Sequence, residues 1–101
     1  MNTPKVENME SPRTGNKVAN QYIITTDEGI TFQSYGTRIV FEPAYIPAMS
    51  TRVTLIDPSW DYSVTTLKYF KQFMGWERYS KKEIEKMLKE RADIYQVTNL
   101  N

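Results

Sequence analysis

Asp57 and Asp61 are the carboxylates whose spacing most resembles a reactive site, because they lie on either side of a short turn that contains Pro58. Two such carboxylates can hold a hard cation such as Mg²⁺ and activate a water molecule for hydrolysis. The structural alternative is that Asp57 organises the turn while Asp61 favours the positive end of a following helix. We expect the structural role, and therefore predict no metal site and no metal-assisted hydrolase.

Other catalytic chemistry is restricted by two residue types that the chain lacks. The sequence has no histidine and no cysteine. Histidine is the usual general base of enzymes, and cysteine supplies both thiolate nucleophiles and zinc ligands. Catalytic sites built on Ser-His-Asp or Cys-His arrangements are therefore excluded. We predict a protein that is not an enzyme and that uses no cofactor.

The segment 60–76, WDYSVTTLKYFKQFMGW, combines aromatic, hydroxyl and basic side chains. On a helix, Lys68, Tyr69 and Lys71 would share the side away from the apolar stripe, with Thr65 and Thr66 near them. A basic and aromatic surface can bind a protein, or can follow phosphates and stack on bases. The alternative is a solvated helix face with Tyr69 packed at its edge.

Two further places carry side chains suited to binding. Trp60 either anchors a partner or pins the helix to the rest of the fold through its large apolar surface. Gln33 and Tyr35 put an amide and an aromatic ring on a strand, where they could bind a peptide edge or a base, or form an ordinary solvent-facing side of a sheet. The candidate partner-binding residues are therefore Tyr35, Gln33, Trp60, Thr65, Thr66, Lys68, Tyr69 and Lys71.

Strands must position the first of these residues. Runs rich in β-branched and aromatic residues predict four strands, at 18–26, 30–35, 37–42 and 51–56. Gly29 would close a three-residue hairpin loop after the first strand. Alternation places Ile39 and Phe41 on one face of the third strand and Val40 on the other. Pro43 ends that strand, and 43–50 is expected to be a loop.

Two helices follow the predicted strands. Ser63 is a candidate N-cap, Gly75 a candidate helix stop, and the residues between them with apolar helical spacing are Val64, Leu67, Phe70, Phe73 and Met74. Ser80 and Glu83 form a capping box that begins a second helix, and a short strand is predicted at 94–98. Segregated strands and helices indicate an α+β fold, with an antiparallel sheet of about four strands followed by two helices packed on one face.

The chain of 101 residues has the length of one small domain. Residues 1–16 contain Pro4, Pro12 and Gly15 without apolar periodicity, and we predict a disordered N-terminal tail before a single domain at 17–101. No signal-peptide pattern and no membrane-spanning run is visible, so we expect a cytoplasmic protein that does not bind membranes. The net charge of +1 falls short of the basic footprint that is usual for nucleic-acid binding.

Three separated segments resemble one known family. They are NQYI at 20–23, FQSYGTRI at 32–39 and WDYSVTTLKYFKQFMG at 60–75, together with the final Asn-Leu-Asn. This pattern is similar to that of small uncharacterised proteins encoded by bacteriophages and mobile elements of gut-type bacteria. Phe70 replaces an arginine and Met74 a leucine of the pattern, and the lost cation weakens a phosphate-binding role for the helix. The resemblance implies a phage-type protein that works by binding in the cytoplasm of a bacterial host.

Three functions follow from these observations. The first is a non-enzymatic binding protein that engages a host or phage protein, with inhibition as one form of such binding. The alternative is a nucleic-acid-binding protein that uses a basic and aromatic surface, which would comprise Lys68, Lys71, Lys81, Lys82 and Tyr69. The third is a structural or oligomerising protein. The sequence leaves the identity of the partner and the oligomeric state open.

Overall fold

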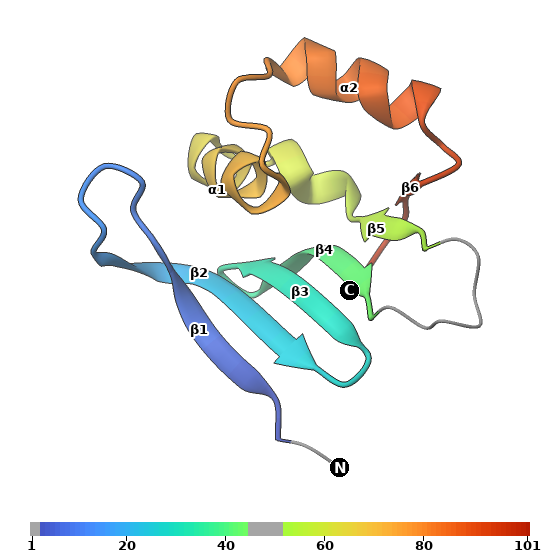
Figure 1. Ribbon diagram of the computed structural model, residues 1–101. Helices are drawn as coiled ribbons and strands as arrows, with labels where there is room; N and C mark the ends of the chain where they lie inside the picture. The colour runs from blue at the N-terminus through green and yellow to red at the C-terminus, as the bar shows by residue number, and fades with distance from the viewer. Residues whose placement is uncertain (1–2, 45–51) are drawn as a thin grey trace.

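The fold is built on one six-stranded sheet, seen in a computed structural model that describes residues 3–44 and 52–101 (Figure 1). The strands follow one another across the sheet in the order in which they occur along the chain. They are β1 (Lys5–Glu10), β2 (Lys17–Thr26), β3 (Gly29–Ser34), β4 (Thr37–Pro43), β5 (Thr54–Ile56) and β6 (Tyr95–Val97). All neighbours pair antiparallel except β5 and β6, which are parallel because the helices intervene between them.

The α+β class is confirmed, whereas the prediction of about four strands is wrong, because β1 and β6 extend the sheet to six. The predicted strand at 94–98 is present as β6. The strand predicted at 51–56 is shorter and begins at Thr54. Most of the predicted loop at 43–50, together with Thr51, lies outside the described residues.

The disordered tail predicted for residues 1–16 is wrong over Lys5–Glu10, which form strand β1. This strand has few apolar residues, but Met9 is buried in the core and the backbone pairs with β2. Pro12 and Gly15, on which the prediction of disorder rested, instead belong to the loop of a hairpin, where the Gly15 amide donates to the Ser11 carbonyl at 2.8 Å. The folded domain therefore begins before residue 17.

A β-bulge at Ile39 changes the predicted faces of β4. Phe32 pairs with Val40 and Gln33 pairs with Arg38, so Ile39 has no partner across the pair. As a result Ile39 and Val40 are both buried, and the expectation that Ile39 shares a face with Phe41 is wrong. The bulge turns Arg38 and Phe41 toward the other face of the sheet, where they line a depression.

The helices begin and end as their capping residues predict. The Ser63 hydroxyl accepts from the Thr66 amide at the start of α1 (Val64–Met74), and Gly75 ends it in the left-handed conformation with φ of 74°. The capping box of Ser80 and Glu83 is present at the start of α2 (Lys81–Glu90). A short 3₁₀ helix, η1 (Pro58–Asp61), leads from β5 toward α1.

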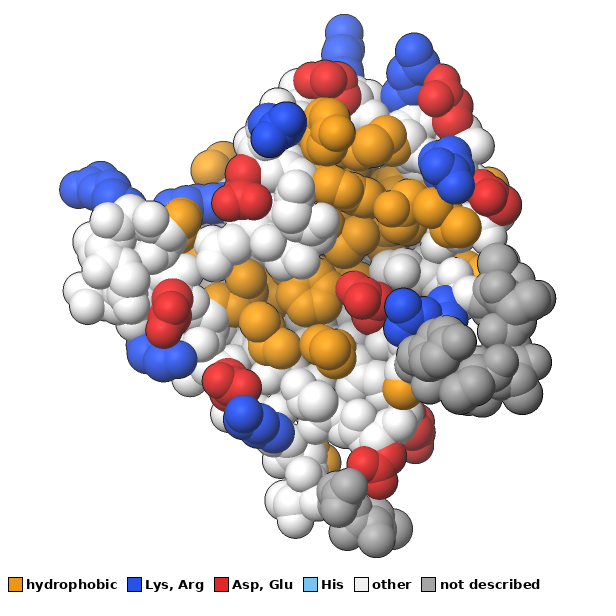
Figure 2. Space-filling model, in the orientation of Figure 1, with side chains coloured by type: hydrophobic (Ala, Val, Ile, Leu, Met, Phe, Trp, Pro, Cys, Tyr) orange, Lys and Arg blue, Asp and Glu red, His pale blue; other side chains and the backbone are white. Residues whose placement is uncertain are grey.

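Aromatic contacts hold α1 against the sheet. Phe73 stacks on Phe32 of β3 at a centroid distance of 5.7 Å. Phe70 lies between Trp60 and Trp76, with ring centroids 5.3 and 5.9 Å away, so both tryptophans pack against the helix. For Trp60 this is the structural alternative that the sequence left open. Ile84 and Leu88 of α2 complete the same core. Such a small chain cannot enclose all of its apolar side chains, and Figure 2 shows them reaching the surface between α2 and β5–β6.

Substituting Gly29 tests the packing of β3 on β4. Gly29 has φ of 153°, and a Cβ there would meet the backbone carbonyl of Glu42 and lie 3.0 Å from Pro43 Cα. We expect Gly29→Ala to lower the free energy of unfolding by about 1–3 kcal/mol, because the clash is with backbone. The measurement is the urea midpoint at unchanged slope. Gly36→Ala is the matched control, since nothing lies within 4 Å of its Cβ position, and an equal loss there would contradict this explanation.

Candidate functional site

Asp57 is buried, and its carboxylate accepts hydrogen bonds from three donors. Oδ2 accepts from the Ser59 amide at 3.0 Å, while Oδ1 accepts from the Leu100 amide at 2.8 Å and from Asn101 Nδ2 at 3.1 Å. Asn101 also exchanges two hydrogen bonds with the backbone of Arg38. The carboxylate therefore caps η1 and fastens the C-terminal residues to β4, which is a structural role.

The hydrogen bonds also set the protonation of this carboxylate. Burial by itself raises the pKa of Asp57, but the donated bonds from Leu100, Ser59 and Asn101 outweigh it, and the pKa lies below its usual value. Asp57 thus stays ionised at neutral pH. Both of its oxygens accept hydrogen bonds from protein groups.

Asp61 points to a different partner, because its Oδ2 lies 3.1 Å from Lys81 Nζ. The two aspartates that could have held a metal ion are thus each engaged by protein groups. Within residues 3–44 and 52–101, no three aspartate or glutamate side chains gather in a way that could bind a cation. The geometry favours the structural interpretation of this pair.

The three segments that carry the family resemblance meet where α1 begins. The Tyr35 amide donates to the Asn20 carbonyl at 2.6 Å, and both residues have positive φ, of 55° and 68°. The Ser34 hydroxyl lies 2.9 Å from the Thr66 hydroxyl, which also accepts from Ser63 at 3.1 Å. These contacts join β2, β3 and α1, so much of the motif serves to place the helix on the sheet.

Burial decides which predicted binding residues can meet a partner. Trp60, Thr66 and Tyr69 have exposed fractions of 6%, 3% and 5%, so their predicted place on a binding surface is wrong. Each is held inside the fold by the packing of η1 and α1 on the sheet. Thr65 and Lys68 are exposed, Lys71 is partly exposed, and Tyr35 lies on the surface of the β3–β4 turn.

The outer side of α1 is the first candidate binding surface. Tyr62 and Val64 are 84% and 87% exposed on either side of the N-cap Ser63. The apolar stripe predicted for this helix is therefore wrong at Val64, because a residue at the first helical position lies beyond the reach of the core. A groove of about 510 Å³ continues along the helix, and its lining residues are Pro12, Val64, Leu67, Lys68, Lys71, Gln72 and Glu77.

Sequence reasoning missed Tyr62 and Val64 as surface residues. The available signal was position, because Tyr62 precedes the N-cap and Val64 follows it directly, where a helix has no preceding turn to bury its side chain. We call Tyr62, Val64, Leu67, Lys68 and Lys71 the α1 surface. Tyr35 adjoins it, since Tyr35 and Tyr62 line the same small depression at the corner of the β3–β4 turn.

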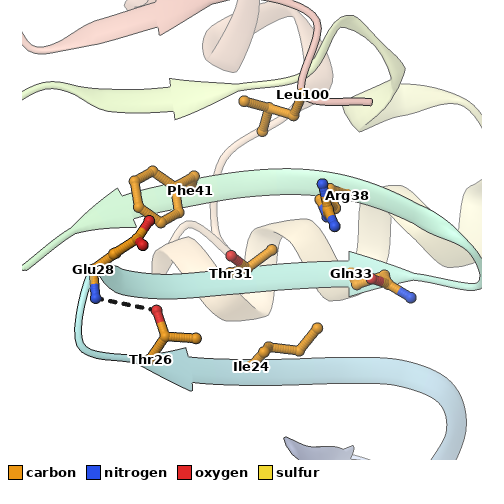
Figure 3. A pocket seen from close by; sticks show the side chains of 8 residues that line it. All are labelled: Ile24, Thr26, Glu28, Thr31, Gln33, Arg38, Phe41 and Leu100. Carbon is orange, nitrogen blue, oxygen red and sulfur yellow. Dashed lines mark hydrogen bonds between the residues drawn. The ribbon is translucent and has the colours of Figure 1, made fainter. Parts of the chain in front are cut away.

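The second candidate is a depression of about 370 Å³ on the sheet face opposite Phe32, which we call the open face (Figure 3). Figure 3 shows Ile24, Phe41 and Leu100 around it, with Glu28 at one end and Arg38 near the other. The predicted residue Gln33 lies here, and its side-chain amide donates to the Tyr35 carbonyl at 2.9 Å. The Phe41 and Arg38 contributions were hidden from sequence reasoning by the bulge.

The model of a family of unknown function, DUF8033, matches residues 4–91. Searches of curated proteins and of solved structures find no match. The family match covers both strand β1 and helix α2, which agrees with a single folded unit that includes the N-terminal hairpin. No helix in the described ranges has the length and apolar character needed to cross a membrane.

The carboxylate of Asp57 and the groups of Ser59, Leu100 and Asn101 that donate to it are called the carboxylate clamp, and replacing Asp57 tests it. We expect Asp57→Asn to lower the free energy of unfolding by about 1.5–3 kcal/mol, because an amide keeps only one acceptor oxygen and sets its NH₂ group against a donor. Urea unfolding gives the size of the loss, and hydrogen exchange should quicken at the Leu100 amide. Asp61→Asn is the control, with a loss below about 1 kcal/mol for a surface ion pair. Similar losses for both variants would count against the clamp.

The clamp also predicts a pH dependence. The folded pKa of Asp57 is depressed below the usual value of 3.8, so its contribution to stability is present above that value and is lost as the pH falls through the folded pKa. We expect the urea midpoint of the natural protein to fall steadily from about pH 4 to about pH 2. The Asp57→Asn variant should show a shallower decline, and parallel curves for the two proteins would contradict the assignment.

Proposed function

We propose that this chain, which belongs to the DUF8033 family, is a non-enzymatic binding protein that engages a protein partner through the α1 surface. The observation that carries the proposal is the exposure of Tyr62 and Val64, at 84% and 87%, beside an apolar groove. Folding gains nothing from two large apolar side chains in water. Tyrosine in particular is enriched among the residues that dominate protein interfaces.

The chemistry of the α1 surface indicates what it would bind. Val64 and Leu67 offer an apolar strip, and Lys68 and Lys71 offer positive charge along the same groove. A partner segment with one or two apolar side chains and neighbouring carboxylates would complement both features. The α1 surface stands on a capped helix pinned by Phe70 and Trp76, so it is rigid before binding and loses little entropy on association.

The cellular setting of the proposal comes from the sequence resemblance. Small phage-type proteins act in the cytoplasm of a bacterial host, and a surface of this kind would occupy a host or phage protein there. Inhibition is one consequence, because a rigid protein bound over an apolar site of the partner excludes the partner's other ligands. This setting and the partner's origin are part of the proposal.

Nucleic-acid binding is less well supported than protein binding. Tyr69, the aromatic ring expected to stack on bases, is 5% exposed, and Lys81 is paired with Asp61 at 3.1 Å. Lys68 Nζ lies over the Tyr69 ring, 5.4 Å from its centroid. Stacking on aromatic side chains supplies much of the affinity for single strands, so the lysines alone would bind weakly.

Capture of a partner tests the α1 surface. Tagged protein would be incubated with bacterial lysate, with and without nuclease, and the retained protein identified and titrated. We expect Tyr62→Ser with Val64→Asp to weaken binding by about 2 kcal/mol or more, roughly 30-fold, since both contacts would be interfacial. The fold should survive, because both side chains point into solvent and an acidic residue suits the first turn of a helix.

Charge reversal supplies a matched comparison. Lys68→Glu with Lys71→Glu should reduce affinity, whereas Lys82→Glu with Lys89→Glu makes the same charge change on exposed positions of α2 and should not. Equal loss from both pairs would indicate a general charge effect and oppose the proposal. Binding that disappears with nuclease, and that falls steeply with salt, would replace the proposal with nucleic-acid binding.

A further inference from the structure

Strand β1 leaves one side of its backbone without a partner among the described strands. It is the first strand in the sheet and pairs only with β2, and Figure 1 shows no other element along its outer side. An exposed edge of six residues is a template for a further strand. We propose that this edge pairs antiparallel with β1 of a second copy of the chain, about a two-fold axis that passes Val6.

The charges of β1 favour an axis at Val6 over an axis at either neighbouring residue. A two-fold axis perpendicular to the sheet pairs each residue with a residue of the same face. An axis at Lys5 would oppose two lysines, and an axis at Glu7 would oppose two glutamates, both of which are destabilising. An axis at Val6 opposes Lys5 of each copy to Glu7 of the other, and so makes two complementary pairs.

The same register extends an apolar row on the open face. In the cross-strand pairs, Val6 stands opposite Ile24, Ile24 opposite Thr31, Thr31 opposite Phe41, and Phe41 opposite Leu55. Val6 ends this row and is 57% exposed. An axis at Val6 places the two valines side by side, so the rows of the two copies join and both valines lose exposed surface.

Lys5 and Glu7 already form an ion pair within one chain, at 3.2 Å, with side chains 71% and 48% exposed. A pair so exposed contributes little to the fold and leaves both groups free to meet the second copy. The contact consists of one strand pair and two valines, which is a small interface. We therefore expect a reversible dimer whose population rises with protein concentration. This inference is independent of the partner proposed for the α1 surface.

The first test uses charge reversal and sedimentation equilibrium across a concentration series. Lys5→Glu makes positions 5 and 7 of each β1 both acidic, and Glu7→Lys makes them both basic, so each variant alone opposes like charges across the axis. We expect each to raise the dimer dissociation constant roughly ten-fold or more. An equimolar mixture of the two variants should associate again, as a heterodimer, because every cross-axis pair is then complementary.

The second test fixes the register. The chain has no cysteine, so Val6→Cys gives each copy one thiol, and the axis sets the two thiols opposite each other. Opposed Cα atoms in an antiparallel pair are about 4.5–5.5 Å apart, which suits a disulfide. We expect oxidation to crosslink Val6→Cys efficiently and Asn8→Cys poorly, because residue 8 of one copy would face residue 4 of the other.

Each outcome decides the proposal. Circular dichroism and thermal unfolding should match the natural protein for Lys5→Glu, Val6→Cys and Glu7→Lys, since these side chains are exposed and lie on an edge. Asn8→Cys loses the hydrogen bond from Asn8 Nδ2 to the Val18 carbonyl, so a small loss of stability is expected there, and crosslinking is compared at a temperature where both cysteine variants are folded. A natural protein that stays monomeric at the highest concentration would overturn the inference. So would a dimer that both charge reversals leave unchanged, or one that crosslinks equally well through residue 8.

Discussion

The buried carboxylate of Asp57 is the polar contact on which the C-terminal half of the fold depends. It caps η1 through Ser59 and holds the Leu100 and Asn101 groups, while the Asp57 amide donates to Ile39 in the β4 bulge at 2.7 Å. The side chain and backbone amide of this one residue thus join the turn before α1, the bulged strand and the last residues of the chain. A buried charge is costly unless its hydrogen bonds are satisfied, so these partners must be ordered together.

The position of α1 follows from that constraint. Once η1 is capped, Trp60 enters the core and Ser63 begins the helix, and the hydroxyls of Ser34 and Thr66 meet at 2.9 Å. With the start of α1 fixed in this way, Phe70 and Phe73 face the core. Tyr62 and Val64 fall outside it for the same reason, so the exposed surface is a consequence of how the helix is fastened.

Sequence reasoning succeeded where local chemistry determines structure and failed where pairing does. Ser63, Gly75 and the Ser80–Glu83 capping box marked the helix ends correctly, because caps act within a few residues. Strand β1 was missed because pairing with β2, rather than its own few apolar residues, makes it a strand. The faces of β4 were misassigned because a simple alternation of faces along the strand does not allow for a bulge. The binding candidates failed at Trp60, Thr66 and Tyr69 because helical spacing alone does not tell which side of a helix meets the sheet.

The two proposed contact regions are physically connected. Gln72 of α1 donates to the Glu10 carbonyl at 2.9 Å, at the end of β1, so the helix that presents the α1 surface also steadies the edge strand. Met9, beside that bond, is buried in the core that α1 completes. The α1 surface and the outer edge of β1 involve different residues, so a two-fold pairing at Val6 leaves Tyr62 and Val64 free in both copies. A dimer would then offer two equivalent partner sites on one rigid sheet, and a partner with two or more binding segments would be held more tightly than by one copy.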